Sequence, residues 1–170
     1  MHLSSILSFG AVASVAYANS FPGFSVASDS ISTIKNILSQ YCIILDTKTY
    51  PDLSKVYTAD AVADFTTIGL GVLSGLPAIE AAMNKSLFGI PTQHGMTTSY
   101  VSDISEKSAN ATSYYTLQQF GTGNNTGQLF TVWGKWVDTL VFENSTWKVK
   151  TRDVVAMGGP LIGNFIVPTH

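Results

Sequence analysis

Residues 129–157, LFTVWGKWVDTLVFENSTWKVKTRDVVAM, contain two runs rich in Val, Thr and Trp on either side of Glu143–Ser145. Such runs are typical of β-strands, and the short polar segment between them is typical of a turn. Two similar runs come earlier, at 94–104 and 111–120, and polar turn segments also separate these runs from their neighbours. The four runs together predict a long antiparallel meander.

The half of the chain before this meander has the spacing of helices. From Ser30, apolar side chains recur every three or four residues, which predicts a helix that Asp29 or Ser30 caps and that ends near 46–48. Its apolar stripe comprises Ile31, Ile34, Leu38, Tyr41, Cys42 and Leu45. Shorter helices are expected at 51–57 and 77–87, each opened by a proline, with a strand at 61–66 between them. This order predicts an α+β domain in which the helices cover one face of the sheet.

The first eighteen residues have the pattern of a secretory signal peptide. Leu3–Ala16 is almost wholly apolar or small, and Ala16-Tyr17-Ala18 supplies the small-x-small pattern that signal peptidase cuts. A membrane anchor is the alternative, but the run is shorter than the ~20 apolar residues of a spanning helix. The expected organisation is a signal peptide at 1–18, a Pro/Gly/Ser linker at 19–29 and one domain at 30–170.

Four N-x-S/T sequons follow the signal segment, at Asn84, Asn110, Asn124 and Asn144. They predict a glycoprotein of a eukaryotic secretory pathway, either secreted or retained in a lumen, without a stable membrane anchor. Cys42 is the single cysteine of the chain, so no intramolecular disulfide forms, and its place in the helical stripe predicts burial. The net charge of −2 without a basic cluster argues against nucleic acid as a partner.

Two carboxylates fall on strand faces that the alternation of side chains predicts to be buried. Asp138 shares its face with Trp136 and Leu140. Asp153 shares a face with Val149, and Arg152 then points to the opposite side. A buried carboxylate is costly without partners, so each is either satisfied within the core, for example by an arginine, or lines a cavity. In a cavity, desolvation raises the pKa of a carboxyl group and equips it as a general acid.

One internal histidine also faces the predicted core. In the run 94–104, alternation places His94 on one face with Met96, Thr98 and Tyr100. Asp46, at the end of the first helix, is either a loop cap or the carboxylate that orients this imidazole. The negative end of the helix dipole is expected to raise the proton affinity of Asp46. No metal or other cofactor is predicted, because one internal histidine with scattered aspartates lacks the spacing of zinc ligands.

Several segments, taken in order, resemble the SnoaL-like branch of the NTF2-like superfamily, which includes scytalone dehydratase. They are residues 41–53, 57–65, 74–79, the Thr-Gln-His at 92–94, and 147–153. The resemblance extends from Ile31 to Met157. It implies a cone in which a curved antiparallel sheet wraps around the N-terminal helices and encloses an apolar pocket.

The resemblance also implies roles for individual residues. Asp46 and His94 match the helix-end aspartate and the first catalytic histidine of scytalone dehydratase. Tyr115 stands at the place of its second catalytic histidine, Phe65 at that of a substrate-positioning tyrosine, and Asp138 near a pocket asparagine. The expected substrate-binding residues are Tyr41, Phe65, Tyr115 and Trp136.

The expected function is cofactor-independent acid–base chemistry on an apolar small molecule. The chain resembles SnoaL-like hydrolases that open polyketide epoxides in fungal pathways of the aurovertin and citreoviridin type. In this interpretation His94, supported by Asp46, takes a proton, and Asp138 or Asp153 protonates the epoxide oxygen. Two alternatives stay open: dehydration, isomerisation or cyclisation with the same pair, and a secreted carrier that only binds its ligand. The family resemblance also suggests a homodimer through the outer sheet face, where Trp133 lies.

Overall fold

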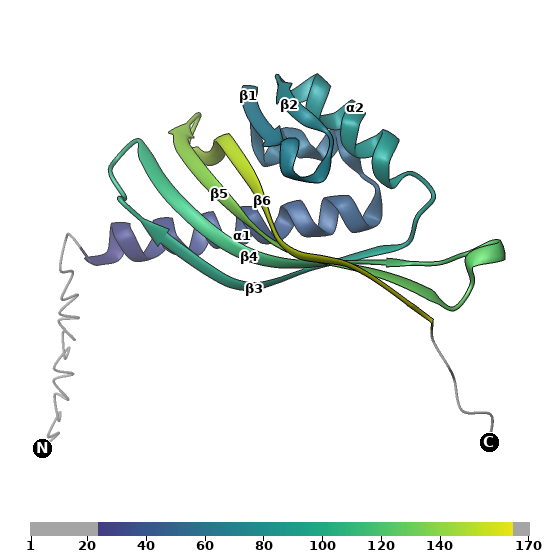
Figure 1. Cartoon of the computed structure of the whole chain (residues 1–170). Helices are drawn as coiled ribbons and strands as arrows, with labels where there is room; N and C mark the ends of the chain where they lie inside the picture. Colours follow the sequence, from purple (N-terminus) through teal and green to yellow (C-terminus); the bar gives the residue numbers. More distant parts are fainter. Residues whose placement is uncertain (1–23, 165–170) are drawn as a thin grey trace, which may run out of the picture.

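The computed structural model describes residues 24–164, which form one curved sheet with helices across its concave side (Figure 1). The sheet has six strands in the order β2-β1-β6-β5-β4-β3. Strand β1 runs parallel to β6, and all other neighbours are antiparallel. The elements are α1 (Phe24–Thr47), η1 (Tyr50–Lys55), β1 (Tyr57–Phe65), η2 (Thr66–Ile68), β2 (Gly71–Ser74), α2 (Leu76–Leu87), β3 (Thr92–Ser102), β4 (Ser108–Phe120), η3 (Gly123–Asn125), β5 (Gln128–Glu143) and β6 (Thr146–Asn164). This architecture confirms the predicted α+β fold and the antiparallel meander.

The predicted start of the first helix is wrong. Helix α1 begins at Phe24, before the expected caps Asp29 and Ser30, so the second half of the predicted linker is helical. Residues 24–29 contain no glycine or proline, and nothing in them interrupts the helix. The predicted signal peptide and residues 19–23 lie outside the described part of the chain. In residues 24–164, no helix is long and apolar enough to cross a membrane.

The apolar residues Leu161 and Ile162 lead to the prediction that the tail from Gly158 closes over the pocket or an interface, whereas the structure continues a strand through it. Strand β6 continues to Asn164 and pairs there with the start of β5, so Phe130 lies opposite Ile162. Leu161 and Ile162 stay exposed. The ends of β4, β5 and β6 project beyond the helices (Figure 1), and we call residues 119–130 with 161–164 the β arm. Phe165 and Ile166 lie outside the described residues.

A bulge in β6 reverses the predicted faces of Arg152 and Asp153. Leu140 of β5 pairs with Val149, but the next residue, Thr139, pairs with Thr151, so Lys150 is an extra residue in β6. An extra residue shifts the two-residue alternation by one position and bends the strand. Arg152 is therefore fully buried, whereas Asp153, predicted to face the core, is exposed.

A second bulge has the same effect in β3. Met96 pairs with Tyr115 and Thr98 with Tyr114, so Thr97 is the extra residue. His94 comes before the bulge and keeps the predicted inward face, and its side chain is only 5% exposed. Tyr100 comes after the bulge and is 68% exposed, which contradicts the predicted alignment of Thr98 and Tyr100 with His94. Both bulges contribute to the curvature of the sheet.

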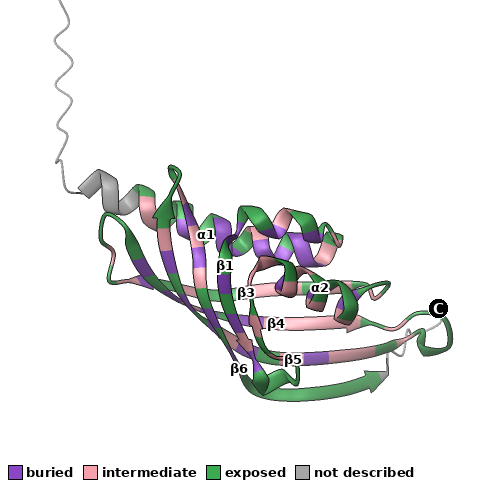
Figure 2. Cartoon of the chain, turned by 90° about the horizontal axis from the view of Figure 1, so that it is seen from above, coloured by how far each residue is buried: buried purple, intermediate pink, exposed green. Residues whose placement is uncertain are grey.

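The core lies where the concave face of the sheet crosses α1 (Figure 2). The apolar stripe of α1 is buried there as predicted, with Ile34, Leu38, Tyr41 and Leu45 at most 2% exposed. Cys42 is buried in the same stripe, and this burial raises the pKa of its thiol to about 11. The thiol is therefore un-ionised at neutral pH, as expected for a cysteine that only fills space.

A buried ion pair lies beneath the aromatic part of this core. Nε and Nη2 of Arg152 donate to the two carboxylate oxygens of Asp138 at 2.7 and 2.9 Å. The guanidinium carbon lies 4.2 Å from the ring centroid of Tyr41 and 4.7 Å from that of Trp136. Burial acts to lower the pKa of Arg152, but the carboxylate of Asp138 outweighs it, so this pKa lies above its ordinary value. Asp138 is thus the partner of a buried cation, the core role that the sequence left open for it.

The four sequon asparagines are all exposed, from α2, β4, η3 and the β5–β6 turn. Asn144 adopts φ 49° in that turn. Their exposure is compatible with glycosylation, which stays a prediction.

Replacing Asp138 with Ala is expected to destabilise the fold by ~3–5 kcal/mol, because it leaves the Arg152 guanidinium buried without its counter-ion. Chemical denaturation followed by far-UV circular dichroism measures the change. The matched control is Asp60→Asn, which removes the exposed partner of Lys150 and should leave the denaturation midpoint unchanged. Equal midpoint shifts in the two variants would contradict this role of the buried pair.

Candidate active site

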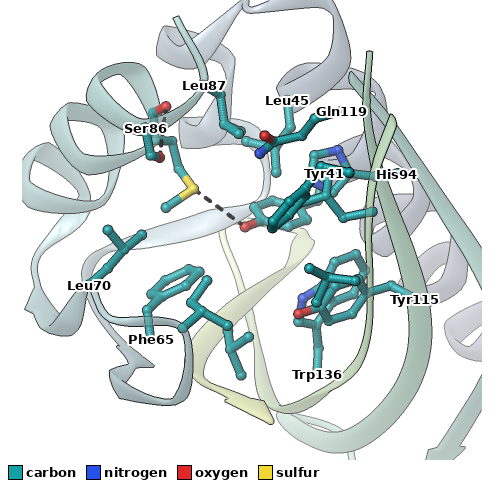
Figure 3. A pocket seen from close by; sticks show the side chains of 16 residues that line it. Tyr41, Leu45, Phe65, Leu70, Ser86, Leu87, His94, Tyr115, Gln119 and Trp136 are labelled. Carbon is teal, nitrogen blue, oxygen red and sulfur yellow. Dashed lines mark hydrogen bonds between the residues drawn. The ribbon is translucent and has the colours of Figure 1, made fainter. Parts of the chain in front are cut away.

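A cavity of about 200 Å³ opens between α1, α2 and the concave face of the sheet (Figure 3). Its wall is mostly apolar, with Leu45, Phe65, Met83, Leu117, Val132 and Val154 contributed by six different elements. Polar groups reach the wall from His94, Tyr41, Tyr115, Ser86 and Gln119. An apolar cavity of ~150 Å³ holds a benzene ring, so this cavity suits a molecule of one or two rings.

Asp46 contacts His94, which lines this cavity, as the family resemblance implied. Nδ1 of His94 lies 2.6 Å from Oδ1 of Asp46, and the backbone N–H of His94 donates to Oδ2 at 2.8 Å. The Thr92 hydroxyl donates to Oδ1 at 2.8 Å. Thr92 and His94 reach the same carboxylate because alternate residues of β3 share a face. The carboxylate at the end of α1 thus accepts three hydrogen bonds from one strand edge.

This geometry determines which imidazole nitrogen faces the ligand. Because ionised Asp46 only accepts hydrogen bonds, Nδ1 of His94 carries the proton between them, and the neutral ring keeps its lone pair on Nε2. Among the described residues no hydrogen bond engages Nε2. Since His94 lines the cavity, the arrangement provides a Brønsted base at the cavity wall.

The electrostatics of Asp46 differ from the sequence expectation. Burial acts to raise the pKa of its carboxyl group, but the hydrogen bonds from His94 and Thr92 and the charge interaction with His94 outweigh it. The pKa of Asp46 therefore lies below its ordinary value, and the predicted increase in proton affinity from the helix dipole is wrong. An ionised Asp46 stabilises His94 when the imidazole gains a proton.

Lys48 and Thr92 extend this network beyond the two predicted residues. Nζ of Lys48 donates to Oγ1 of Thr92 at 2.7 Å. An ammonium group can only donate, so the Thr92 oxygen accepts from it and gives its single proton to Asp46. Lys48 reaches this position because it follows α1 in the left-handed region, with φ 62°. Sequence reasoning missed both residues, although Lys48 and Thr92 stand two positions from Asp46 and His94.

The two other aspartates predicted to be catalytic lie outside the cavity wall. Both oxygens of Asp138 are occupied by Arg152 in the core, and Asp153 points to solvent on the opposite face. Of the described residues that line the cavity, none carries a carboxyl group. The structure therefore offers no carboxylic acid at the place where the sequence analysis expected one. Within residues 24–164, no three His, Cys, Asp or Glu side chains gather closely enough to hold a metal ion.

The four predicted substrate-binding residues all line the cavity. Tyr115 stacks on Trp136 with ring centroids 4.5 Å apart, and Tyr41 packs edge-on against Trp136 at 5.2 Å. Phe65 and Phe130 complete the aromatic part of the wall. Burial raises the pKa of Tyr41, and it raises that of Tyr115 to about 12, so both phenols keep their protons at neutral pH. The Tyr41 hydroxyl donates to Sδ of Met83 at 3.8 Å, a weak acceptor, and either phenol can donate instead to an oxygen atom of a ligand.

Comparison with solved structures gives many proteins of the same fold. A protein from Kribbella flavida has a TM-score of 0.70 and 20% identity, covering 76% of this chain and 92% of its own. A protein provisionally assigned as a scytalone dehydratase from Novosphingobium aromaticivorans DSM 12444 has a TM-score of 0.70 and 18% identity. The match covers 85% of this chain and 93% of that protein. A type 3 hexachlorocyclohexane dehydrochlorinase from Novosphingobium barchaimii LL02 has a TM-score of 0.68 and 18% identity. The match covers 85% of this chain and 97% of that enzyme.

These similarities establish the fold, and no curated protein sequence matches closely enough to add to them. The sequence itself matches the SnoaL-like domain over residues 27–153. That range extends from the first turns of α1 to β6 and includes Asp46, His94 and the whole aromatic wall of the cavity. The chain therefore belongs to the SnoaL-like family.

Proposed function

We propose that this protein is a cofactor-free acid–base enzyme that removes a proton from a neutral, largely apolar ring compound. The observation that carries the proposal is the 2.6 Å contact between Nδ1 of His94 and Oδ1 of Asp46 at the wall of an apolar cavity. Nε2 of His94 takes the proton, and the ionised carboxylate stabilises the imidazolium that forms. The apolar wall strengthens this charge interaction, because it keeps the local dielectric low.

Elimination is the reaction that the cavity supports best. Nε2 takes the proton of the C–H bond adjacent to the carbon that carries the leaving group. The electron pair of that C–H bond forms the new double bond, and the leaving group departs with the electron pair of its own bond to carbon. Tyr41 or Tyr115 donates a hydrogen bond to the departing atom, which suits a wall whose described residues include phenols but no carboxyl group. The dehydratase and dehydrochlorinase names of two structural neighbours support this reaction type.

Opening of a polyketide epoxide is the second candidate. Here Nε2 takes the proton of a water or of a substrate hydroxyl, the oxygen attacks carbon, and the epoxide C–O bond breaks. The expected acids Asp138 and Asp153 do not reach the cavity, so a tyrosine phenol must donate to the epoxide oxygen. The Gln119 amide on the wall favours this candidate, because it offers a polar partner to a bound water.

We also propose, from the sequence, that the protein travels through a secretory pathway. The exposure of all four sequon asparagines supports this route. Expression in a eukaryotic host should give a product that begins at Asn19 and loses mass on endoglycosidase treatment. A product that keeps residues 1–18 and shows no change in mass would contradict it.

The first catalytic prediction concerns a bicyclic probe that reports on a base in an apolar pocket. 5-Nitrobenzisoxazole loses one ring proton, its N–O bond breaks, and the coloured cyanophenolate appears. We expect His94→Ala and Asp46→Asn each to lower the rate by ~10²-fold or more, because they remove the base and its orienting carboxylate. Near-UV circular dichroism checks that both variants stay folded.

The matched control is Ser86→Ala, whose hydroxyl lines the cavity but already donates within α2, and which should keep the wild-type rate. Wild-type rates in the His94 and Asp46 variants would contradict the base assignment. Ligand binding that is unaffected by His94→Ala, with no turnover of any probe by the wild type, would indicate the carrier function instead.

Product analysis separates the two reactions. Indene oxide incubated in ¹⁸O-labelled water should be recovered without label if elimination is the only chemistry of the cavity. A labelled diol whose formation depends on His94 would favour epoxide hydrolysis.

The second catalytic prediction concerns the charge of Lys48. We expect Lys48→Met to raise the pH of half-maximal benzisoxazole turnover by about half a pH unit, because the ammonium disfavours the positively charged imidazolium. Lys48→Arg keeps the charge and should restore the wild-type profile. An unchanged profile in Lys48→Met would show that this residue acts only through packing.

A further inference from the structure

A second cavity of about 280 Å³ adjoins the β arm, and the candidate active site does not account for it. Gln119 of β4 and Phe130 of β5 line both this cavity and the one that contains His94. These two residues lie directly opposite each other in the sheet. The two cavities are therefore neighbours across one cross-strand pair.

A row of paired residues on one face of the sheet connects the surroundings of His94 with the second cavity. Thr92 pairs with Gln119, Gln119 with Phe130, and Phe130 with Ile162. Directly opposed residues of antiparallel strands project their side chains to the same face. The row begins at Thr92, which donates to Asp46, and ends at Ile162 in the wall of the second cavity. A ligand held beside His94 can thus continue along the inner face into the arm.

The chemistry of the second cavity differs from that of the first. Side chains with neutral hydrogen-bonding groups come from Gln119, Thr122, Asn125 and Gln128. Its apolar lining residues include Ile162, from the face of Gln119 and Phe130, and the next opposed pair, Phe120 and Leu129. None of the described residues that line it is charged, so it offers no counter-ion to an anionic group. Amides and a hydroxyl instead suit alcohols, ethers and carbonyls.

We propose that the second cavity is an extension subsite for the same ligand, taking an uncharged oxygenated chain attached to the ring that occupies the first cavity. The substrate class is then a ring compound with a neutral, hydroxyl- or carbonyl-bearing side chain. The inference rests on the proposed function only in requiring that the first cavity holds the ring.

Isothermal titration calorimetry with three probes tests the subsite. The probes are 2-naphthol, 6-(4-hydroxybutoxy)-2-naphthol and 6-(3-carboxypropoxy)-2-naphthol. The wild type should bind the hydroxybutoxy probe about tenfold more tightly than 2-naphthol, because the chain adds contacts in the second cavity. The carboxypropoxy probe should show no such gain, because its carboxylate finds no counter-ion in the second cavity.

Two neighbouring tryptophan variants localise the effect. Ile162→Trp fills the second cavity and should abolish the tenfold gain. Leu161→Trp is the matched control, because the neighbouring Leu161 is similarly exposed but lines neither cavity and points to the opposite face, so the gain should persist.

Equal affinities of the wild type for 2-naphthol and the hydroxybutoxy probe would overturn the proposal, and so would a gain that survives Ile162→Trp. Because these affinities are measured at equilibrium, they are independent of turnover. If the protein shows no benzisoxazole turnover but still binds the hydroxybutoxy probe about tenfold more tightly than 2-naphthol, only the proposed function is contradicted. If the protein turns over the benzisoxazole but binds the two naphthols equally tightly, only the subsite is contradicted.

Discussion

The site depends on one carboxylate that joins a helix to a sheet edge. Asp46, at the end of α1, accepts hydrogen bonds from the Thr92 hydroxyl, the His94 backbone and the His94 ring, all from the first residues of β3. These bonds fix the place where α1 crosses the concave face of the sheet. They also fix the imidazole in one tautomer, with Nε2 toward the cavity. The same three contacts thus serve the packing of the fold and the chemistry of the site.

The buried ion pair shows a different use of charge. Arg152 and Asp138 are both enclosed, and the guanidinium packs against the rings of Tyr41 and Trp136 that form part of the cavity wall. A paired guanidinium under these rings supports their position without exposing a carboxyl group to the ligand. This explains why an acid that the sequence marks as buried is not an acid of the site. It leaves the phenols of Tyr41 and Tyr115 as proton-bearing groups on the wall of the cavity that His94 lines.

Much of the fold and the central pair could be predicted from the sequence, because both depend on local regularities. The helical stripe that includes Leu38 and Leu45 has a clear period, and the family resemblance joined Asp46 to His94. The faces of Tyr100 and Asp153 could not be predicted, because the bulges at Thr97 and Lys150 shift the alternation and no sequence pattern announces them. The role of Lys48 depends on its own left-handed backbone conformation directly after α1. The second cavity arises from the pairing of β6 with β5 in the arm, where the sequence predicted a tail that closes over the pocket or an interface.

The central claim is that His94 is a base whose Nδ1–H is held by Asp46, leaving Nε2 free at the cavity. Nitrogen-15 NMR of histidine-labelled protein, recorded at a pH where the ring is neutral, measures this directly, with His94→Gln identifying the signals of this ring. The account predicts a neutral ring protonated on Nδ1, with a strongly deshielded Nδ1 proton that loses its deshielding in Asp46→Asn. A ring protonated on Nε2, or spectra that Asp46→Asn leaves unchanged, would contradict it.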